Sequence, residues 1–302
     1  MTNTQALPKQ GFILLAAITL FWGLNWPGLK IITAELPVWW FRTSCLLVGG
    51  SLLLLLSRLS GNRWTIARQD FAPLLLVTVF NVCGWHAMSA WGVSLAPAGQ
   101  AAIVGFTMPL WASILAVWLL HEQMTARRIG GLLLGLIGLA VLMGEDLANL
   151  TRAPKGLLLM LAAAICWAIG MVLFKKGKWQ TPIATHIGWQ LLIGSIPVAM
   201  VAWHFEPYPE FSELSQRAWI ALIYIYLFPM TFCQWAYLKI VHLFPASTAA
   251  IGTLLIPIVG VISSAIILDE IIGWAEIIAL LLTCSGLALV LLQPVKKSAP
   301  GN

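Results

Sequence analysis

The sequence predicts an all-α polytopic membrane protein with ten transmembrane helices in two inverted five-helix repeats. Of its 302 residues, 60% are hydrophobic and 9% are charged, with a mean hydropathy of +0.90. A soluble domain carries roughly 25% charged residues, so this composition excludes a soluble globular protein. One stretch of the chain is also written twice in the same register, which predicts an internal repeat.

The repeated stretch covers residues 97–122 and 245–270. The first copy reads PAGQAAIVGFTMPLWASILAVWLLHE and the second PASTAAIGTLLIPIVGVISSAIILDE. A constant offset of 148 residues aligns the two copies. The pairs that this offset brings together are Pro97 with Pro245, Pro109 with Pro257, Glu122 with Glu270, and 138–140 with 286–288.

Ten apolar segments are each close to the length of about 20 residues that a membrane span needs. The loops between them are short; the two longest are Ser57–Asp70 and His204–Gln216. We therefore predict a first repeat over 11–147, a second over 156–292, and no soluble domain. In chain order the predicted spans are 11–32, 37–57, 71–94, 97–120, 127–147, 156–175, 182–203, 217–241, 245–268 and 272–292.

Basic residues in the loops orient the spans. With the N-terminus in the cytoplasm, twelve Lys and Arg residues fall on the cytoplasmic side and four on the far side. Cytoplasmic loops carry the excess of positive charge, so both termini are predicted to be cytoplasmic. Five spans per half is an odd number, so the second half must enter the membrane from the opposite side. The repeat is therefore predicted to be inverted.

Several motifs resemble the EamA family of the drug/metabolite transporter superfamily. They are Phe21–Asn25 in the first span, Phe41-Arg42 in the second, and the duplicated stretch with its prolines and closing glutamates. The resemblance implies alternating access around a central cavity lined mainly by helices 1, 3, 4, 6, 8 and 9. It also implies export of amino acids and related metabolites. The second half departs from the pattern, because Ala168 rather than glycine follows Trp167.

Polar and aromatic residues inside the spans are the candidates for substrate binding, because polar groups are costly in hydrocarbon. Asn81, Trp85 and Met88 share one face of the third span. A similar stripe on the eighth span consists of Tyr224, Phe228, Thr231 and Trp235. Ordinary core packing is the alternative for each. The predicted substrate-binding residues are Trp22, Asn25, Asn81, Trp85, His86, Met108, Trp167, Tyr224 and Trp235.

Pro109 and Pro257 are predicted to bend a pair of gating helices, since proline removes a helical hydrogen bond in mid-helix. A static kink is the alternative reading. Arg42 is the one basic residue well inside a predicted span. It is suited either to bind a substrate carboxylate or to extend its charge to the interface.

The predicted function is a transporter, in the exporting direction, of a small metabolite such as an amino acid or related amphipathic compound. It would lie in a bacterial-type inner membrane as a monomer or weak dimer, with the lipid bilayer as surroundings and protons as one candidate coupling ion. No catalytic residue, cofactor, metal site or nucleic-acid partner is predicted, and the five cysteines all lie in apolar segments. The alternatives are a same-fold exchanger of another organic solute and a membrane-embedded enzyme.

Overall fold

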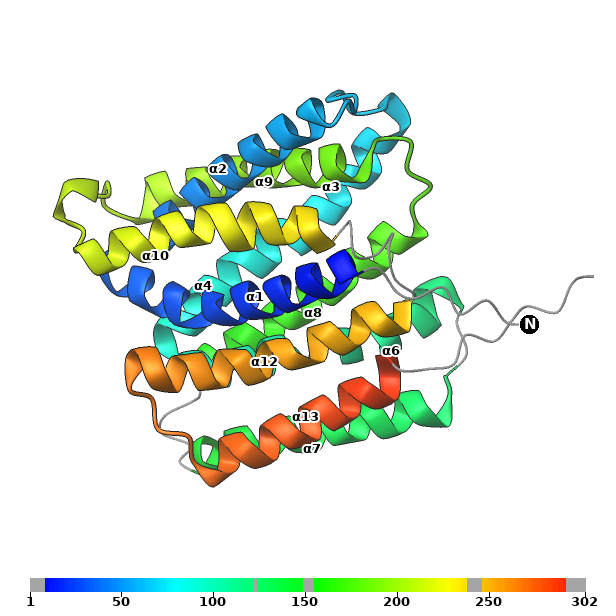
Figure 1. Ribbon diagram of the computed structural model, residues 1–302, viewed down its shortest axis with the longest axis vertical. Helices are drawn as coiled ribbons and strands as arrows, with labels where there is room; N and C mark the ends of the chain where they lie inside the picture. Colours follow the sequence, from blue (N-terminus) through cyan, green and yellow to red (C-terminus); the bar gives the residue numbers. More distant parts are fainter. Residues whose placement is uncertain (1–8, 122–123, 149–154, 238–245, 292–302) are drawn as a thin grey trace, which may run out of the picture.

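The computed structural model describes residues 9–121, 124–148, 155–237 and 246–291, which form helices joined by short turns (Figure 1). The helices of the first half are α1 (Lys9–Glu35), α2 (Val38–Leu59), α3 (Phe71–Thr78), η2 (Val79–Gly84), α4 (Trp85–Leu95), α5 (Ala98–Gly105), α6 (Met108–Leu120) and α7 (Ala126–Ala148). Those of the second half are α8 (Lys155–Lys176), α9 (Ile183–Phe205), α10 (Gln216–Leu227), η4 (Phe228–Phe232), α12 (Ala246–Leu268) and α13 (Trp274–Leu291). Two single 3₁₀ turns, η1 (Arg68–Asp70) and η3 (Phe211–Glu213), lie in the longer loops.

The chain is a multi-pass membrane protein. Among the described residues, seven helices are long and apolar enough to cross a bilayer, and many of their large apolar side chains face outward. Three further apolar helices are shorter: Ile129–Val141, Leu255–Leu268 and Trp274–Leu289. Helices thus occupy all ten predicted segments, while the count of ten spans stays a prediction.

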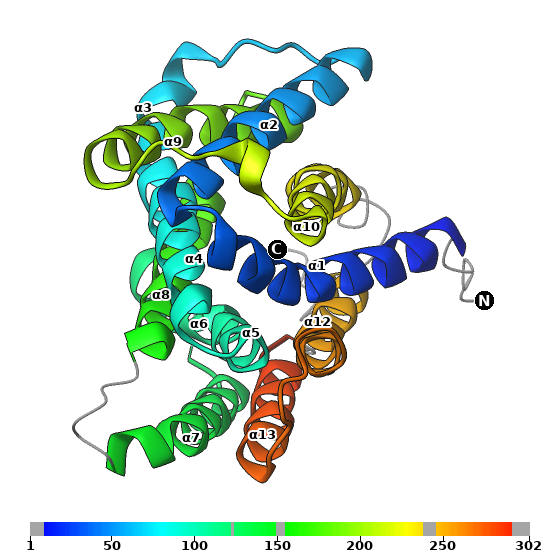
Figure 2. The ribbon, with the colours of Figure 1, turned by 90° about the vertical axis from the view of Figure 1, so that its left-hand side faces the viewer.

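Helices from the two halves pack against one another in matching pairs. The second helix of each half meets its counterpart, α2 with α9, and the last helices α7 and α13 do the same (Figure 1). Helix α1 lies between α10 and α12 (Figure 2), and α8 packs against α4, α5 and α6. The first helix of each half is therefore embedded among helices of the other half.

Glycine permits a close contact between α1 and α12. A Cβ atom on Gly23 would overlap the side chain of Val259. The glycine within the motif Phe21–Asn25 is thus required by helix packing. A second close contact, between α8 and η2, places a Cβ on Gly170 only 2.6 Å from Cβ of Asn81.

At one end of the bundle, carboxylates cap helix N-termini by accepting hydrogen bonds from their backbone N–H groups. Glu270, beyond the end of α12, accepts from the backbone N–H groups of Ala98 and Gly99 at 2.6 and 2.9 Å. Glu206 accepts from Trp39 and Trp40 at the start of α2. These first-turn N–H groups have no partner within their own helix, so each carboxylate satisfies donors that belong to the other half.

Two further side chains complete this end, which lies at the left of Figure 1. Glu35 at the end of α1 accepts from the backbone N–H and hydroxyl of Ser215, just before α10. Lys30 donates from Nζ to the carbonyls of Val93, Ser94 and Ala96 at 2.9–3.0 Å. We call this end the capped face, defined by Lys30, Glu35, Glu206 and Glu270.

Local backbone features recur at equivalent places in the two halves. His121 and Asp269, which are 148 residues apart, both adopt left-handed conformations, with φ of 54° and 56°. Each ends the helix of the duplicated stretch. The glutamate that follows is Glu270 in the second copy; Glu122 in the first lies outside the described residues.

The two repeated prolines occupy different local structures. The chain leaves the α-helix at Phe106 and Thr107, so Pro109 is the second residue of the new helix α6. Pro257 lies inside the continuous helix α12. The expectation that Pro109 sits in mid-helix is therefore not met, since a short break precedes it. Whether either proline bends a gate stays a prediction.

Candidate functional site

Two π-helical segments mark equivalent positions in the third span of each half. They are η2 (Val79–Gly84) and η4 (Phe228–Phe232). Each is followed by a tryptophan, Trp85 or Trp235, and these residues are 150 positions apart. A π-helical segment accommodates an extra residue and is frequent at functional sites. The candidate site is built around these two segments.

The first segment carries an aromatic pair with α8. The rings of Trp85 and Trp167 meet edge to face, with centroids 6.5 Å apart and planes inclined by 60°. A Cβ on Gly84 would lie 2.8 Å from Cβ of Cys166, so η2 runs directly along α8. The first helix of the second half thus presents its tryptophan to the third span of the first half.

The second segment makes the matching contact with α1. Trp22 donates from Nε1 to the carbonyl of Pro229 at 3.3 Å, and its ring lies 5.8 Å from that of Tyr237. Phe21 packs against three rings at centroid distances of 4.4–6.3 Å. Those rings belong to Tyr224, Phe228 and Phe232. Trp235 continues the row beside Phe232 at 5.9 Å.

Asn25 and Asn81 are half-buried amides without a hydrogen-bond partner in the part of the chain that the structure describes. Asn25 lies on α1, three residues beyond Trp22, and Asn81 lies within η2. An amide that is removed from water without a partner costs free energy. Both amides therefore keep unused donors and acceptors, and their role in binding substrate stays a prediction.

His86 is buried next to the start of α4, with 8% of its surface exposed. Among the residues that the structure describes, its Nδ1 atom has no hydrogen-bond partner, and neither has Nε of the buried Arg42. Arg42 donates from a terminal nitrogen to the Ser89 hydroxyl at 3.0 Å, and its guanidinium group lies over the ring of Phe41. Arg42 thus stays in the protein interior and does not extend to the interface.

Met108 begins α6, directly after the break in the fourth span. It is half-buried and packs against the main hydrophobic core. The hydroxyl of Thr107 donates to the carbonyl of Val104 at 2.6 Å and accepts from Nε1 of Trp111 at 3.1 Å. Thr107 therefore stabilises the break on both sides and fixes the start of α6.

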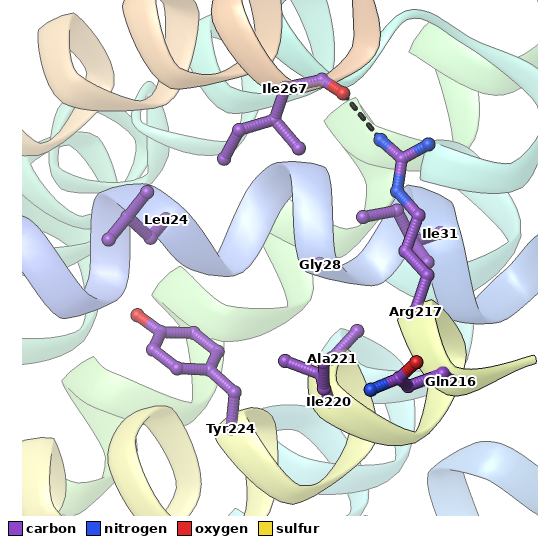
Figure 3. Close-up of a pocket in the computed structure, with 9 residues that line it drawn as sticks. All are labelled: Leu24, Gly28, Ile31, Gln216, Arg217, Ile220, Ala221, Tyr224 and Ile267. Carbon is purple, nitrogen blue, oxygen red and sulfur yellow. Dashed lines mark hydrogen bonds between the residues drawn. The ribbon is translucent and has the colours of Figure 1, made fainter.

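A groove of about 600 Å³ opens between α1, α10 and α12 (Figure 3). Helix α1 forms its floor, and Arg217 reaches across from α10 to donate to the carbonyl of Ile267 on α12. Tyr224 is the predicted site residue that lines it. The lining residues are Leu24, Gly28, Ile31, Gln216, Arg217, Ile220, Ala221, Tyr224 and Ile267.

Sequence reasoning missed part of the aromatic row around Phe21. The predicted stripe on the eighth span ran through Thr231, but the Thr231 hydroxyl donates to the carbonyl of Tyr226, five residues earlier. Phe232 takes the place in the row instead. The signal available was the spacing of four between Tyr224, Phe228 and Phe232, which continues through the π-helical segment.

Comparison with known proteins gives a consistent family assignment. Residues 9–144 and 154–292 each match the profile of the EamA-like transporter family. The chain is 23% identical over 274 residues to the uncharacterized transporter YoaV of Bacillus subtilis, an alignment that covers 90% of this chain and 94% of that protein. A solved crystal structure with 20% identity superposes with a TM-score of 0.64, covering 93% of this chain and 97% of that one.

Two similar proteins carry more specific descriptions. A probable amino-acid metabolite efflux pump of Salmonella typhimurium is 24% identical over 300 residues, covering 92% of this chain and 93% of that protein. The aromatic amino acid exporter YddG of Ancylobacter novellus is 24% identical over 215 residues, covering 68% of this chain and 72% of that protein.

Proposed function

Because this chain belongs to the EamA-like transporter family, we propose that it exports an amino acid or a related amphipathic metabolite by alternating access. The descriptions of the similar efflux pump and exporter support this substrate class. The apolar and aromatic character of the site supports it as well. The ammonium or carboxylate group of the substrate would hydrogen-bond to the amides of Asn25 and Asn81. The aromatic rings of the site would pack against the apolar part of the substrate.

The observation that carries the proposal is that a tryptophan on the first helix of each half contacts the third span of the other half, Trp22 by a hydrogen bond and Trp167 by its ring. Trp22 of the first helix meets the π-helical segment of the second half, and Trp167 meets the tryptophan after the segment of the first half. An alternating-access carrier needs two halves that can rock about a site between them. Equivalent contacts formed reciprocally across the two halves are what such a site requires.

The proposed architecture is ten spans in two inverted repeats, 11–147 and 156–292, around a central cavity. The crosswise packing of α1 and α8, the counterpart pairs α2–α9 and α7–α13, and the paired turns at His121 and Asp269 support it. We further propose that the protein lies in a bacterial-type inner membrane with both termini in the cytoplasm, which the excess of Lys and Arg in the loops on that side supports. The capped face then lies on the outer side, where its hydrogen bonds hold the helix ends together.

The orientation has a direct test. Reporter fusions after Asn302 and within the loop 204–216 should report opposite sides of the membrane, with Asn302 in the cytoplasm. If both reporters lie on the same side of the membrane, the proposed inverted repeat is wrong.

Export is tested first in cells and then with purified protein. Cells that overproduce the chain should release one or more amino acids into the medium faster than cells with an empty vector. The amino acid found should then exchange against itself across proteoliposomes that contain the purified protein. Release that persists with the Asn25→Ala/Asn81→Ala double variant, with an unchanged half-saturating concentration, would contradict the proposed site.

A further inference from the structure

We propose that the groove between α1, α10 and α12 binds an anionic phospholipid of the membrane, with its acyl chain along the groove and its phosphate on Arg217. The groove shares Tyr224 with the aromatic row at η4, while its other lining residues lie outside the aromatic contacts at the π-helical segments. The proposal stands whether or not the exported solute is an amino acid.

The floor and walls of the groove are aliphatic. Leu24, Gly28 and Ile31 follow one face of α1 at spacings of four and three, a distance of about 10 Å along the helix. Ile220 and Ala221 of α10 form one wall, and Ile267 of α12 lies on the other side (Figure 3). An extended hydrocarbon chain fits such a channel, and burial of its surface stabilises the complex.

The polar atoms of the groove gather at one end. Arg217 and Gln216 are exposed in the first turn of α10, next to the capped face. At the other end the Tyr224 hydroxyl donates to the carbonyl of Phe21 at 2.7 Å, so it offers the groove only its ring. The groove therefore has the polarity of an amphiphile, with one charged end and one apolar end.

Arg217 forms no ion pair among the described residues. Its recorded interaction is the bond from one terminal nitrogen to the carbonyl of Ile267. The nearby carboxylate of Glu35 is engaged by Ser215. Guanidinium groups bind phosphate oxygens through two parallel hydrogen bonds. A phosphate at the membrane surface is thus the matching partner for the free donors of Arg217.

The groove opens sideways, toward the bilayer. Ile220 and Ile223 on α10 are 62% and 49% exposed, which places the rim of the groove in contact with hydrocarbon in a membrane-spanning helix. A lipid can enter from the bilayer without crossing a polar surface. This argues for a membrane phospholipid and against a water-soluble solute as the occupant.

The test uses the full-length protein in detergent with equal amounts of phosphatidylglycerol and phosphatidylcholine of identical chains, and native mass spectrometry counts the lipids retained. The wild-type protein should prefer phosphatidylglycerol. Arg217→Gln should lower that preference about fivefold, the effect of one basic residue at a charged membrane surface. Arg217→Lys should restore most of it, while Arg58→Gln, which removes an exposed arginine at the end of α2, should leave it unchanged.

A second variant tests the apolar part. A Cβ on Gly28 would make ordinary contact at 3.6 Å with Ile225, so this position in the groove tolerates a side chain. Gly28→Leu should fill the groove and reduce retention of both lipids. Equal retention of the two lipids by the wild type, or an unchanged preference in Arg217→Gln, would overturn the proposal. So would displacement of the lipid by free amino acids, which would make the groove a substrate site.

Discussion

The carboxylate of Glu270 accepts a 2.6 Å hydrogen bond from the backbone N–H of Ala98, although the two residues belong to different halves of the chain. Glu270 follows a left-handed residue, Asp269, which turns the chain back at the end of α12. Ala98 begins α5, and its N–H has no partner within that helix. The end of one copy of the duplicated stretch therefore caps the start of the other.

Glu270→Gln should loosen the capped face. The carboxylate stabilises the first turn of α5 both as a hydrogen-bond acceptor and by its charge, effects of about 0.5–2 kcal/mol in total. Hydrogen exchange at the amides of Ala98 and Gly99 should rise by about fivefold in the variant. Glu213→Gln, an exposed glutamate in the loop before α10, is the matched control. Unchanged exchange in Glu270→Gln would show that the cap does not hold this end.

Lys30→Met should destabilise the protein. Lys30 serves three carbonyls at the end of α4, and methionine keeps the apolar stem but leaves them without that donor. We expect a loss of about 1–3 kcal/mol, measured as a lower thermal midpoint in detergent. Lys30→Arg retains the charge, and its thermal midpoint should lie between those of the wild type and Lys30→Met. A midpoint of Lys30→Met equal to that of the wild type would contradict the role assigned to Lys30.

The sequence predicted the membrane class, the family and every helical segment, because hydropathy and the duplicated stretch are local signals. It could not predict the partners of Glu270, Glu206 and Lys30. Each of these side chains serves backbone groups more than 60 residues away, and an acid at a helix end looks the same in the sequence whether or not it caps a distant helix. The apolar groove was missed for a similar reason, since its walls come from three helices that no sequence spacing connects.

Asn25→Ala and Asn81→Ala should each raise the half-saturating concentration for export. Loss of one buried hydrogen bond costs about 1–3 kcal/mol, or about fivefold to more than a hundredfold in affinity. Trp274→Ala is the control, because Trp274 is 79% exposed at the start of α13. The measurement is the initial rate of counterflow against substrate concentration. Wild-type concentration dependence in both asparagine variants would remove them from the site.

Pro257→Ala should affect transport more than Pro109→Ala. Within the continuous helix α12, alanine supplies the N–H that Pro257 lacks and removes its clash with the preceding turn. Pro109 lies in the first turn of α6, where proline is well tolerated and no bond is regained. The measurement compares the transport rates of the two variants, each normalised to the amount of protein in the membrane. An equal loss in both variants would restore the symmetric gating that the sequence predicted.

Gly23→Ala should separate α1 from α12. Its Cβ would overlap the side chain of Val259, and overpacking of this kind costs about 1–3 kcal/mol. Gly28→Ala, on the same helix but in ordinary contact, is the control and should be near neutral. The thermal midpoint of the purified protein is the readout. The double variant Gly23→Ala/Val259→Ala should recover part of the loss, and its failure to do so would place the cause elsewhere.

The limits of spacing arguments are clearest in the third and eighth spans. A stripe drawn at helical spacing from Asn81 to Met88, or from Tyr224 to Trp235, crosses a π-helical segment. The extra residue there changes which side chains share a face. In the eighth span, Phe232 and not Thr231 therefore lies in the aromatic row. Neither segment carries a pattern in the sequence that distinguishes it from α-helix, so the spacing of four between Tyr224, Phe228 and Phe232 was not recognised as one aromatic row.

The same two spans are held at one end, α4 by Lys30 and α10 by Glu35 through Ser215. Each nevertheless carries a surplus residue in its middle. One residue corresponds to about 100° of rotation in a helix. If the surplus moves along the span, every side chain that it passes turns by that angle, while the anchored end keeps its place. Such a shift would turn an aromatic ring, Trp85 or Trp235, without any sliding of the whole helix.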